Sequence, residues 1–171
     1  MRMCTRTSPP VLPVASVPAG SGVVINSNDD IEVFGNEIRD NATANIIVSS
    51  VYSTGYKDSS ASPNFDPYPE RIYIHGNTLS GGGDSPDGFD LKALKVATYG
   101  LGGNFPDVLW DGYFNKDRVV DGNKVGPQIC LRDISGVVNA DGPGGYKNPS
   151  KDAKAHDCAL PRLPAIDLKR G

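Results

Sequence analysis

The sequence predicts an all-β fold of short strands that stack as successive coils of a solenoid. Two internal alignments indicate this: residues 23–27 (VVINS) align with 46–50 (IIVSS), and residues 31–38 (IEVFGNEI) align with 72–79 (IYIHGNTL). The first alignment gives a period in the low twenties. Short strands that recur with such a period are typical of solenoids, because each repeat buries its apolar face only against its neighbours.

Each repeat unit contains two short strands, at 22–25 and 31–34 in the first copy, followed by a Gly-Asn corner. The second alignment spans more of the chain than the first, so the second copy carries an insertion between its strands, which fits 51–68. Weaker echoes suggest strands at 89–91 and 108–112, and again after residue 122. A β-sandwich is less favoured, because no copy has a two-residue hairpin turn between equal strands.

Side chains alternate across a strand, so every second residue of these segments is expected to face the core. Trp110 is also expected inside, in the register of Val33 and Ile74. The predicted core consists of Val23, Ile25, Ile31, Val33, Ile46, Val48, Ile72 and Ile74. At the glycine corners, Asn36, Asn77 and Asn123 are predicted to form a structural amide ladder between adjacent coils.

Three long strings extend the pattern beyond the repeat itself. They are VPAGSGVVINSNDDIEVFGNEIRDNATANIIVSSVY, DPYPERIYIHGNTLSGGGDSPDG and NFPDVLWDGYF. Together they resemble a bacterial family of exported parallel β-helix repeat proteins, over residues 17–168. The resemblance implies a right-handed, single-stranded parallel β-helix, an extracytoplasmic location and an unassigned activity. Members of that family tend to be encoded beside a secreted c-type cytochrome-like protein, so the resemblance also implies this protein as a partner.

The resemblance implies that this chain is the C-terminal part of a longer protein. Residues 1–20 are expected to be an irregular leader, with no signal peptide and with the status of Met1 as the native start left open. Residues 21–134 are expected to form the coils, with loop insertions at 51–68 and 81–106. Residues 91–100 fit either a short helical turn or a strand plus loop, and the strand plus loop is favoured. Residues 135–171 are expected to be an irregular tail packed on the coils.

Composition excludes two classes of partner. The formal net charge is −3, which leaves no basic surface for nucleic acid. No apolar run reaches the length of a membrane-spanning helix.

Carboxylates in the loop after residue 80 are the one candidate cofactor site. Asp84, Asp87 and Asp90 lie three residues apart in a glycine-rich loop and offer hard oxygen ligands of the kind that Ca²⁺ takes. No terminal Glu completes a known calcium motif, so a solvated loop is the favoured alternative. Asp29 and Asp30 are sequence neighbours at a corner, where backbone hydrogen bonding is favoured over catalysis.

The histidines and aromatic residues carry weaker signals. His75 is expected to point outward from a strand, and His156 lies in the tail, so the two do not indicate a metal site. No catalytic set is predicted. A second candidate surface, for a sugar or a protein partner, is formed by Tyr52, Tyr56, Phe65 and Tyr68. Covering the wall of the coils is an equally good interpretation of these rings.

Cys130 and Cys158 are predicted to form a disulfide. The exported compartment that the resemblance implies permits the bond. A tail rich in Pro and Lys also needs an attachment to the coils. The alternative is that Cys130 is a small buried apolar residue and Cys158 a free thiol.

Two functions follow from these observations. The favoured one is a non-catalytic exported scaffold or interaction module, acting with the cytochrome-like protein. The alternative is a polysaccharide-active lyase, hydrolase or epimerase of the pectate-lyase-like β-helix type. An enzyme needs a groove in which an acid, a base and a cation converge, whereas a scaffold does not.

Overall fold

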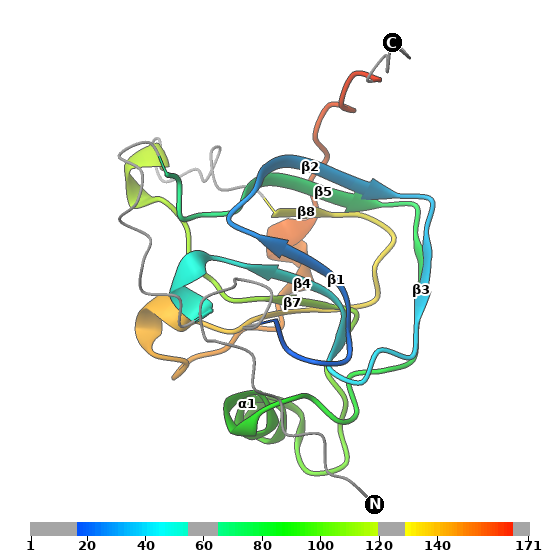
Figure 1. Ribbon diagram of the computed structural model, residues 1–171, viewed down its shortest axis with the longest axis vertical. Helices are drawn as coiled ribbons and strands as arrows, with labels where there is room; N and C mark the ends of the chain where they lie inside the picture. The colour runs from blue at the N-terminus through cyan, green and yellow to red at the C-terminus, as the bar shows by residue number, and fades with distance from the viewer. Residues whose placement is uncertain (1–16, 55–64, 120–128, 166–171) are drawn as a thin grey trace, which may run out of the picture.

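The computed structural model describes residues 17–54, 65–119 and 129–165. In these stretches the chain forms three short parallel sheets and one α-helix (Figure 1). The largest sheet has the order β1-β4-β7-β9. Its strands are β1 (Ser21–Asn26), β4 (Ala44–Ser49), β7 (Val108–Trp110) and β9 (Val137–Asn139).

The other two sheets are smaller. The three-stranded sheet consists of β2 (Asp29–Phe34), β5 (Glu70–His75) and β8 (Ile129–Leu131). The two-stranded sheet pairs β3 (Glu37–Arg39) with β6 (Thr78–Ser80). The chain passes through β1, β2 and β3 and then returns beside β1 as β4, so strands of neighbouring turns pair in parallel.

The predicted strand register is confirmed. Val23 pairs with Ile46 in the large sheet, as the first internal alignment requires. Ile31 pairs with Ile72 in the three-stranded sheet, as the second alignment requires. The inward side chains of both sheets meet in one apolar core, which contains all eight predicted residues, with Val23, Ile31 and Val33 only partly buried.

The predicted fold class is wrong. The described chain is a small mixed α/β structure with separate sheets of four, three and two strands, not an all-β, single-stranded right-handed β-helix solenoid of the pectate-lyase-like type. The repeats are too unequal for uniform coils. In the later pairings, Ile46 meets Val108 and Ile72 meets Ile129, so much longer segments separate these strands than separate Val23 from Ile46.

One of these segments contains helix α1 (Phe89–Tyr99), where strand and loop were expected. The segment holds good helix formers, with leucines at 91 and 94, and the buried Leu94 anchors it to the large sheet. Gly88 and Gly100 flank the helix at φ values of 78° and 77°, and glycine takes this conformation without strain. Figure 1 shows α1 at one end of the molecule, outside the sheets.

Two further expectations need correction. Trp110 is buried as predicted, but it pairs with Val48 in the large sheet and not in the Val33 and Ile74 set. The stretch expected to be an irregular tail supplies β9, because its apolar Val137 and Val138 continue both faces of the large sheet.

The predicted Cys130–Cys158 disulfide is present, and it joins β8 to the segment after η6 (Ala153–His156). Among the described residues, no helix has the length and apolarity to cross a membrane.

Candidate functional site

The outward face of the large sheet is apolar, unlike a sheet face exposed to water. All six residues of β4 are buried, which is typical of a parallel strand covered on both sides. One face of the sheet packs in the main core. The other face packs against α1 through Ala44 and Ile47 of β4 and Leu109 of β7. A second apolar cluster therefore joins the helix to the sheet.

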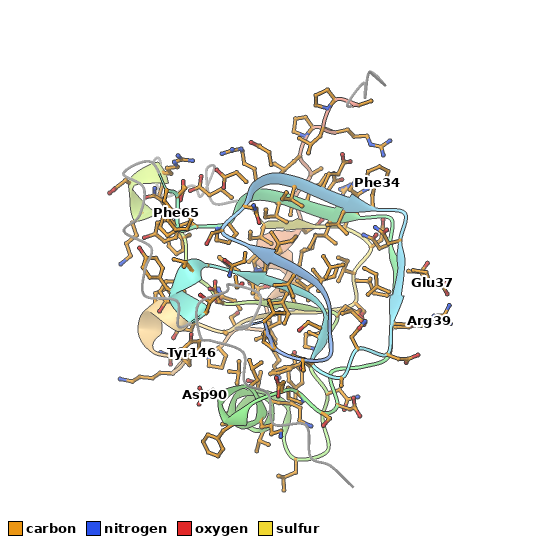
Figure 2. All side chains as sticks on the ribbon, in the orientation of Figure 1. Phe34, Glu37, Arg39, Phe65, Asp90 and Tyr146 are labelled. Carbon is orange, nitrogen blue, oxygen red and sulfur yellow. A yellow bond between two sulfur atoms is a disulfide. The ribbon has the colours of Figure 1, made fainter. Side chains whose placement is uncertain are left out.

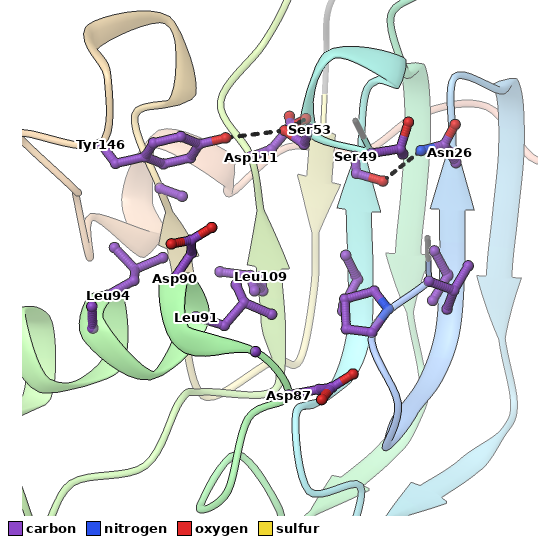
Figure 3. Close-up of a pocket in the computed structure, with 18 of the residues that line it drawn as sticks. Asn26, Ser49, Ser53, Asp87, Asp90, Leu91, Leu94, Leu109, Asp111 and Tyr146 are labelled. Carbon is purple, nitrogen blue, oxygen red and sulfur yellow. Dashed lines mark hydrogen bonds between the residues drawn. The ribbon is translucent and has the colours of Figure 1, made fainter. Parts of the chain in front are cut away.

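The helix does not cover this face completely and leaves a cleft of about 930 Å³, called here the α1 cleft. Its floor is formed by Val24, Ile47 and Leu109 of the sheet, and its opposite wall by Leu91 and Leu94 of α1. Figure 3 shows these leucines, with Asp90 beside them, between two polar ends. One end carries Asp87, and the other carries Asn26, Ser49, Ser53, Asp111 and Tyr146.

The larger polar end is built where the strands stop. Asn26 and Ser49 are paired residues at the ends of β1 and β4, and Asn26 Nδ2 donates to Ser49 Oγ at 2.9 Å. Ser53 lies in the following 3₁₀ turn η2 (Val51–Ser53), with its Oγ 3.4 Å from the hydroxyl of Tyr146. These hydroxyl and amide groups offer both donors and acceptors to a ligand.

Asp111 fixes this end of the cleft. It is 7% exposed. Its Oδ2 accepts from Ser50 N at 2.6 Å, Ser50 Oγ at 2.8 Å and Ser53 Oγ at 2.7 Å. Its Oδ1 accepts from Tyr113 N at 3.1 Å. Burial raises the pKa of Asp111, while these hydrogen bonds oppose the rise. Because both oxygens are already engaged, this carboxyl group positions the η2 turn and is poorly placed to transfer a proton to a ligand.

Acidic groups converge at a second place, the start of the three-stranded sheet. Asp29, Asp66 and Glu70 each place one carboxylate oxygen within 4.8 Å of the others, and we call them the acidic cluster. Arg118, in the 3₁₀ turn η4 (Lys116–Arg118), donates from Nη1 to Glu70 Oε2. These three carboxylates form the only group of three or more potential metal ligands within residues 17–54, 65–119 and 129–165.

The carboxylates predicted as a Ca²⁺ site are not part of that group. Asp84, Asp87 and Asp90 are exposed. Asp87 Oδ2 accepts from Ala19 N at 2.9 Å, and the carbonyl oxygen of Asp84 accepts from Lys95 Nζ at 2.7 Å. Asp87 and Asp90 line the α1 cleft instead, and Asp90 lies in the first turn of the helix, where a negative charge complements the helix dipole.

The predicted aromatic surface is only partly assembled. The ring centroid of Tyr52 lies 5.6 Å from that of Tyr68 and 5.3 Å from that of Tyr113. Burial and the hydrogen bond with Tyr52 raise the pKa of Tyr68 to about 12. Phe65 is 43% exposed and stands at the edge of the molecule (Figure 2). Tyr56 lies outside the described residues.

Neither histidine contributes to a metal group in the described chain. His75 points outward, stacks between the rings of Phe34 and Tyr73, and has Nε2 2.8 Å from Glu32 Oε1. His156 is buried beside the disulfide, with Nδ1 3.1 Å from the carbonyl oxygen of Ile129. Both side chains therefore contribute to packing.

Two members of the predicted asparagine ladder lie in register. Asn77 Oδ1 accepts from Asn36 Nδ2 at 3.1 Å and from Asn36 N at 3.0 Å. Asn77 Nδ2 also donates to the carbonyl oxygen of Val33 at 2.8 Å. Asn123 lies outside the described residues. These amides connect adjacent turns at a corner away from the cleft.

Sequence reasoning missed the α1 cleft and the acidic cluster. The cleft depends on α1, for which the leucines at 91 and 94 between two glycines were the available signal. The alignment that pairs Ile31 with Ile72 also pairs Asp29 with Glu70, but the contact between these carboxylates was not inferred.

In comparisons with known proteins, no protein-family model, no curated protein and no solved structure matches the chain.

Proposed function

We propose that the protein is a non-catalytic interaction module of an extracytoplasmic compartment, and that its α1 cleft binds a basic, amphipathic segment of a partner protein. The supporting observation is the lining of the cleft. Apolar side chains form its middle part, and Asp87, Asp90 and Asp111 supply negative charge. No Lys, Arg or His is found among the described residues that line it. A segment with an apolar face and flanking cations is complementary to this surface.

The disulfide supports the proposed compartment. Disulfides persist in oxidising surroundings and are rare in the reducing cytosol. Cys130 is completely buried and is bonded to Cys158 of the chain's last described segment. The family resemblance makes a secreted c-type cytochrome-like protein the first partner to test.

A polysaccharide-active enzyme is the second candidate, because the cleft contains more than one carboxylate and glycosidic bond cleavage commonly uses two. One observation disfavours it. Both oxygens of Asp111, the buried carboxylate of the cleft, are held by hydrogen bonds from the protein itself. At the acidic cluster, the cations that an enzyme would direct at a substrate are paired with carboxylates.

A pair of synthetic peptides tests the binding proposal. The first is an amphipathic helix with leucines on one face and lysines on the other, and the second has glutamates in place of the lysines. We expect fluorescence anisotropy to detect binding of the lysine peptide, weakening as salt is added, and no binding of the glutamate peptide. Ala97 lines the cleft, whereas its neighbour Val96 does not. Ala97→Trp should therefore abolish binding, and Val96→Trp should retain it.

The same protein preparation tests the enzyme alternative. Incubation with acidic polysaccharides should release no reducing or unsaturated sugar. Equal binding of both peptides, or binding that survives Ala97→Trp, would rule out the cleft as the proposed site. Sugar release that is lost in Asp90→Asn would instead establish the enzyme.

A further inference from the structure

Two carboxylates face each other across the start of the three-stranded sheet. Asp29 of β2 and Glu70 of β5 are paired residues in neighbouring parallel strands. Like charges placed directly opposite each other destabilise a sheet. The side chain of Glu70 is 0% exposed, and that of Asp29 is 31% exposed, so water cannot fully screen the repulsion. Something besides solvent must therefore compensate this pair.

The arginines nearby compensate only part of the charge. Arg118 Nη1 contacts Glu70 Oε2, and Arg118 Nη2 lies 3.5 Å from Asp66 Oδ2. Arg71 is engaged mainly by Asp30, with Nε 2.6 Å from Oδ1 and Nη2 2.7 Å from Oδ2. Four carboxylates, of Asp29, Asp30, Asp66 and Glu70, thus meet two guanidinium groups, so two negative charges remain uncompensated.

Two of the carboxylate oxygens have no hydrogen-bond partner. Asp29 Oδ1 and Glu70 Oε1 are both buried and unsatisfied. Buried polar atoms almost always have a partner, and a bound cation would supply one to both of these oxygens. The arginine contacts use the other oxygens, Asp29 Oδ2 and Glu70 Oε2. The orphaned oxygens are thus available to a ligand.

The spacing of the cluster fits a hard cation. The three ligand oxygens lie within 4.8 Å of one another. Oxygens bound to one Ca²⁺ ion lie about 2.3–2.6 Å from it, so two ligands on opposite sides of the ion are about 5 Å apart. The donor set holds only carboxylate oxygen, without His or Cys, which disfavours zinc and copper. Mg²⁺ requires stricter octahedral geometry and gives up its waters reluctantly.

We propose that Asp29, Asp66 and Glu70 form a Ca²⁺ site that ties the start of β5 to β2. The bound ion neutralises the two uncompensated charges and coordinates the orphaned oxygens of Asp29 and Glu70. Glu70 is the central ligand because its side chain is completely buried. Asp66 extends the site to the segment that precedes β5. The site is separate from the α1 cleft and does not depend on the function proposed for it.

Calorimetric titration of the EDTA-treated full chain with CaCl₂ tests the site directly. We expect one Ca²⁺ per chain, with MgCl₂ binding at least tenfold more weakly. Asp29→Asn, Asp66→Asn and Glu70→Gln should each weaken Ca²⁺ binding by more than tenfold. The matched control is Asp84→Asn, which removes an exposed carboxylate elsewhere and should bind like the wild type.

Thermal melts give a readout that separates loss of a ligand from loss of folding. In EDTA at neutral pH, Asp29→Asn should melt above the wild type, because it removes one of the two carboxylates that face each other across β2 and β5. In excess Ca²⁺ the order should reverse, because only the wild type is stabilised by the ion. Absence of calcium binding in the wild type would overturn the proposal, as would calcium binding that is lost only in the control variant.

Discussion

Ile72 lies at the centre of the apolar core, and shortening its side chain tests the register on which the fold depends. The residue is 0% exposed and pairs with Ile31 of β2 on one side and Ile129 of β8 on the other. Both neighbouring strands are fixed by parallel hydrogen bonding, so the cavity left by Ile72→Ala has little room to collapse. Substitutions of this kind cost about 2–5 kcal/mol, and the constrained surroundings lead us to expect about 4 kcal/mol.

Ile31→Ala provides the matched control. Ile31 occupies the same register position, but it lies on the edge strand of its sheet and is only partly buried. We expect it to cost about 1–2 kcal/mol, because less apolar contact is lost and the surroundings can adjust. Urea unfolding followed by fluorescence measures both values, provided that the dependence on urea is the same for all three proteins. Equal costs for the two variants, or a cost below about 1 kcal/mol for Ile72→Ala, would refute the central placement of Ile72.

Two further predictions concern stability. The double variant Cys130→Ala/Cys158→Ala opens a loop of 28 residues. The chain-entropy relation gives a loss of about 3.5 kcal/mol in the free energy of unfolding. A melting temperature that calorimetry finds unchanged under non-reducing conditions would contradict this. Hydrogen bonds from Arg71 lower the pKa of Asp30, so this pair stabilises the fold at pH values above the usual aspartate range, and the contribution is lost as pH falls through the lowered pKa. Asp30→Asn should remove that part of the acid sensitivity, and a melting profile between neutral and acid pH that matches the wild type would show that the pair contributes nothing.

The strand register could be predicted because it follows from a local rule. Inward and outward side chains alternate, so an alignment that places Val23 on Ile46 and Ile31 on Ile72 leaves no freedom to shift a strand by one residue. The rule does not determine the fold class. Pairing two strands says nothing about the segments between them, and here those segments differ in length from one turn to the next.

Helix α1 shows why the repeat was a poor guide outside the paired strands. It follows two good copies of the repeat, so the repeat predicts a further strand at this position. Leu91 and Leu94 lie three residues apart, which suits one face of a helix and not an alternating strand. The cleft could not be foreseen without the helix, and Asp87 and Asp90 were therefore assigned to a solvated or calcium-binding loop.

The acidic pair could have been predicted from the same alignment that gave the core. The alignment that places Asn77 beside Asn36 equally places Glu70 beside Asp29. Stacked amides can satisfy each other, because each has both a donor and an acceptor. Stacked carboxylates only accept and repel each other, so the pair requires a proton, an arginine or a metal ion between the strands. Arg118 engages Glu70 Oε2. Glu70 Oε1 and Asp29 Oδ1 have no partner, which is the reason to expect an ion at these two oxygens. In a chain whose repeats stack in register, a carboxylate that aligns with another carboxylate is therefore a signal for a ligand, whereas an aligned asparagine is a signal for a structural contact.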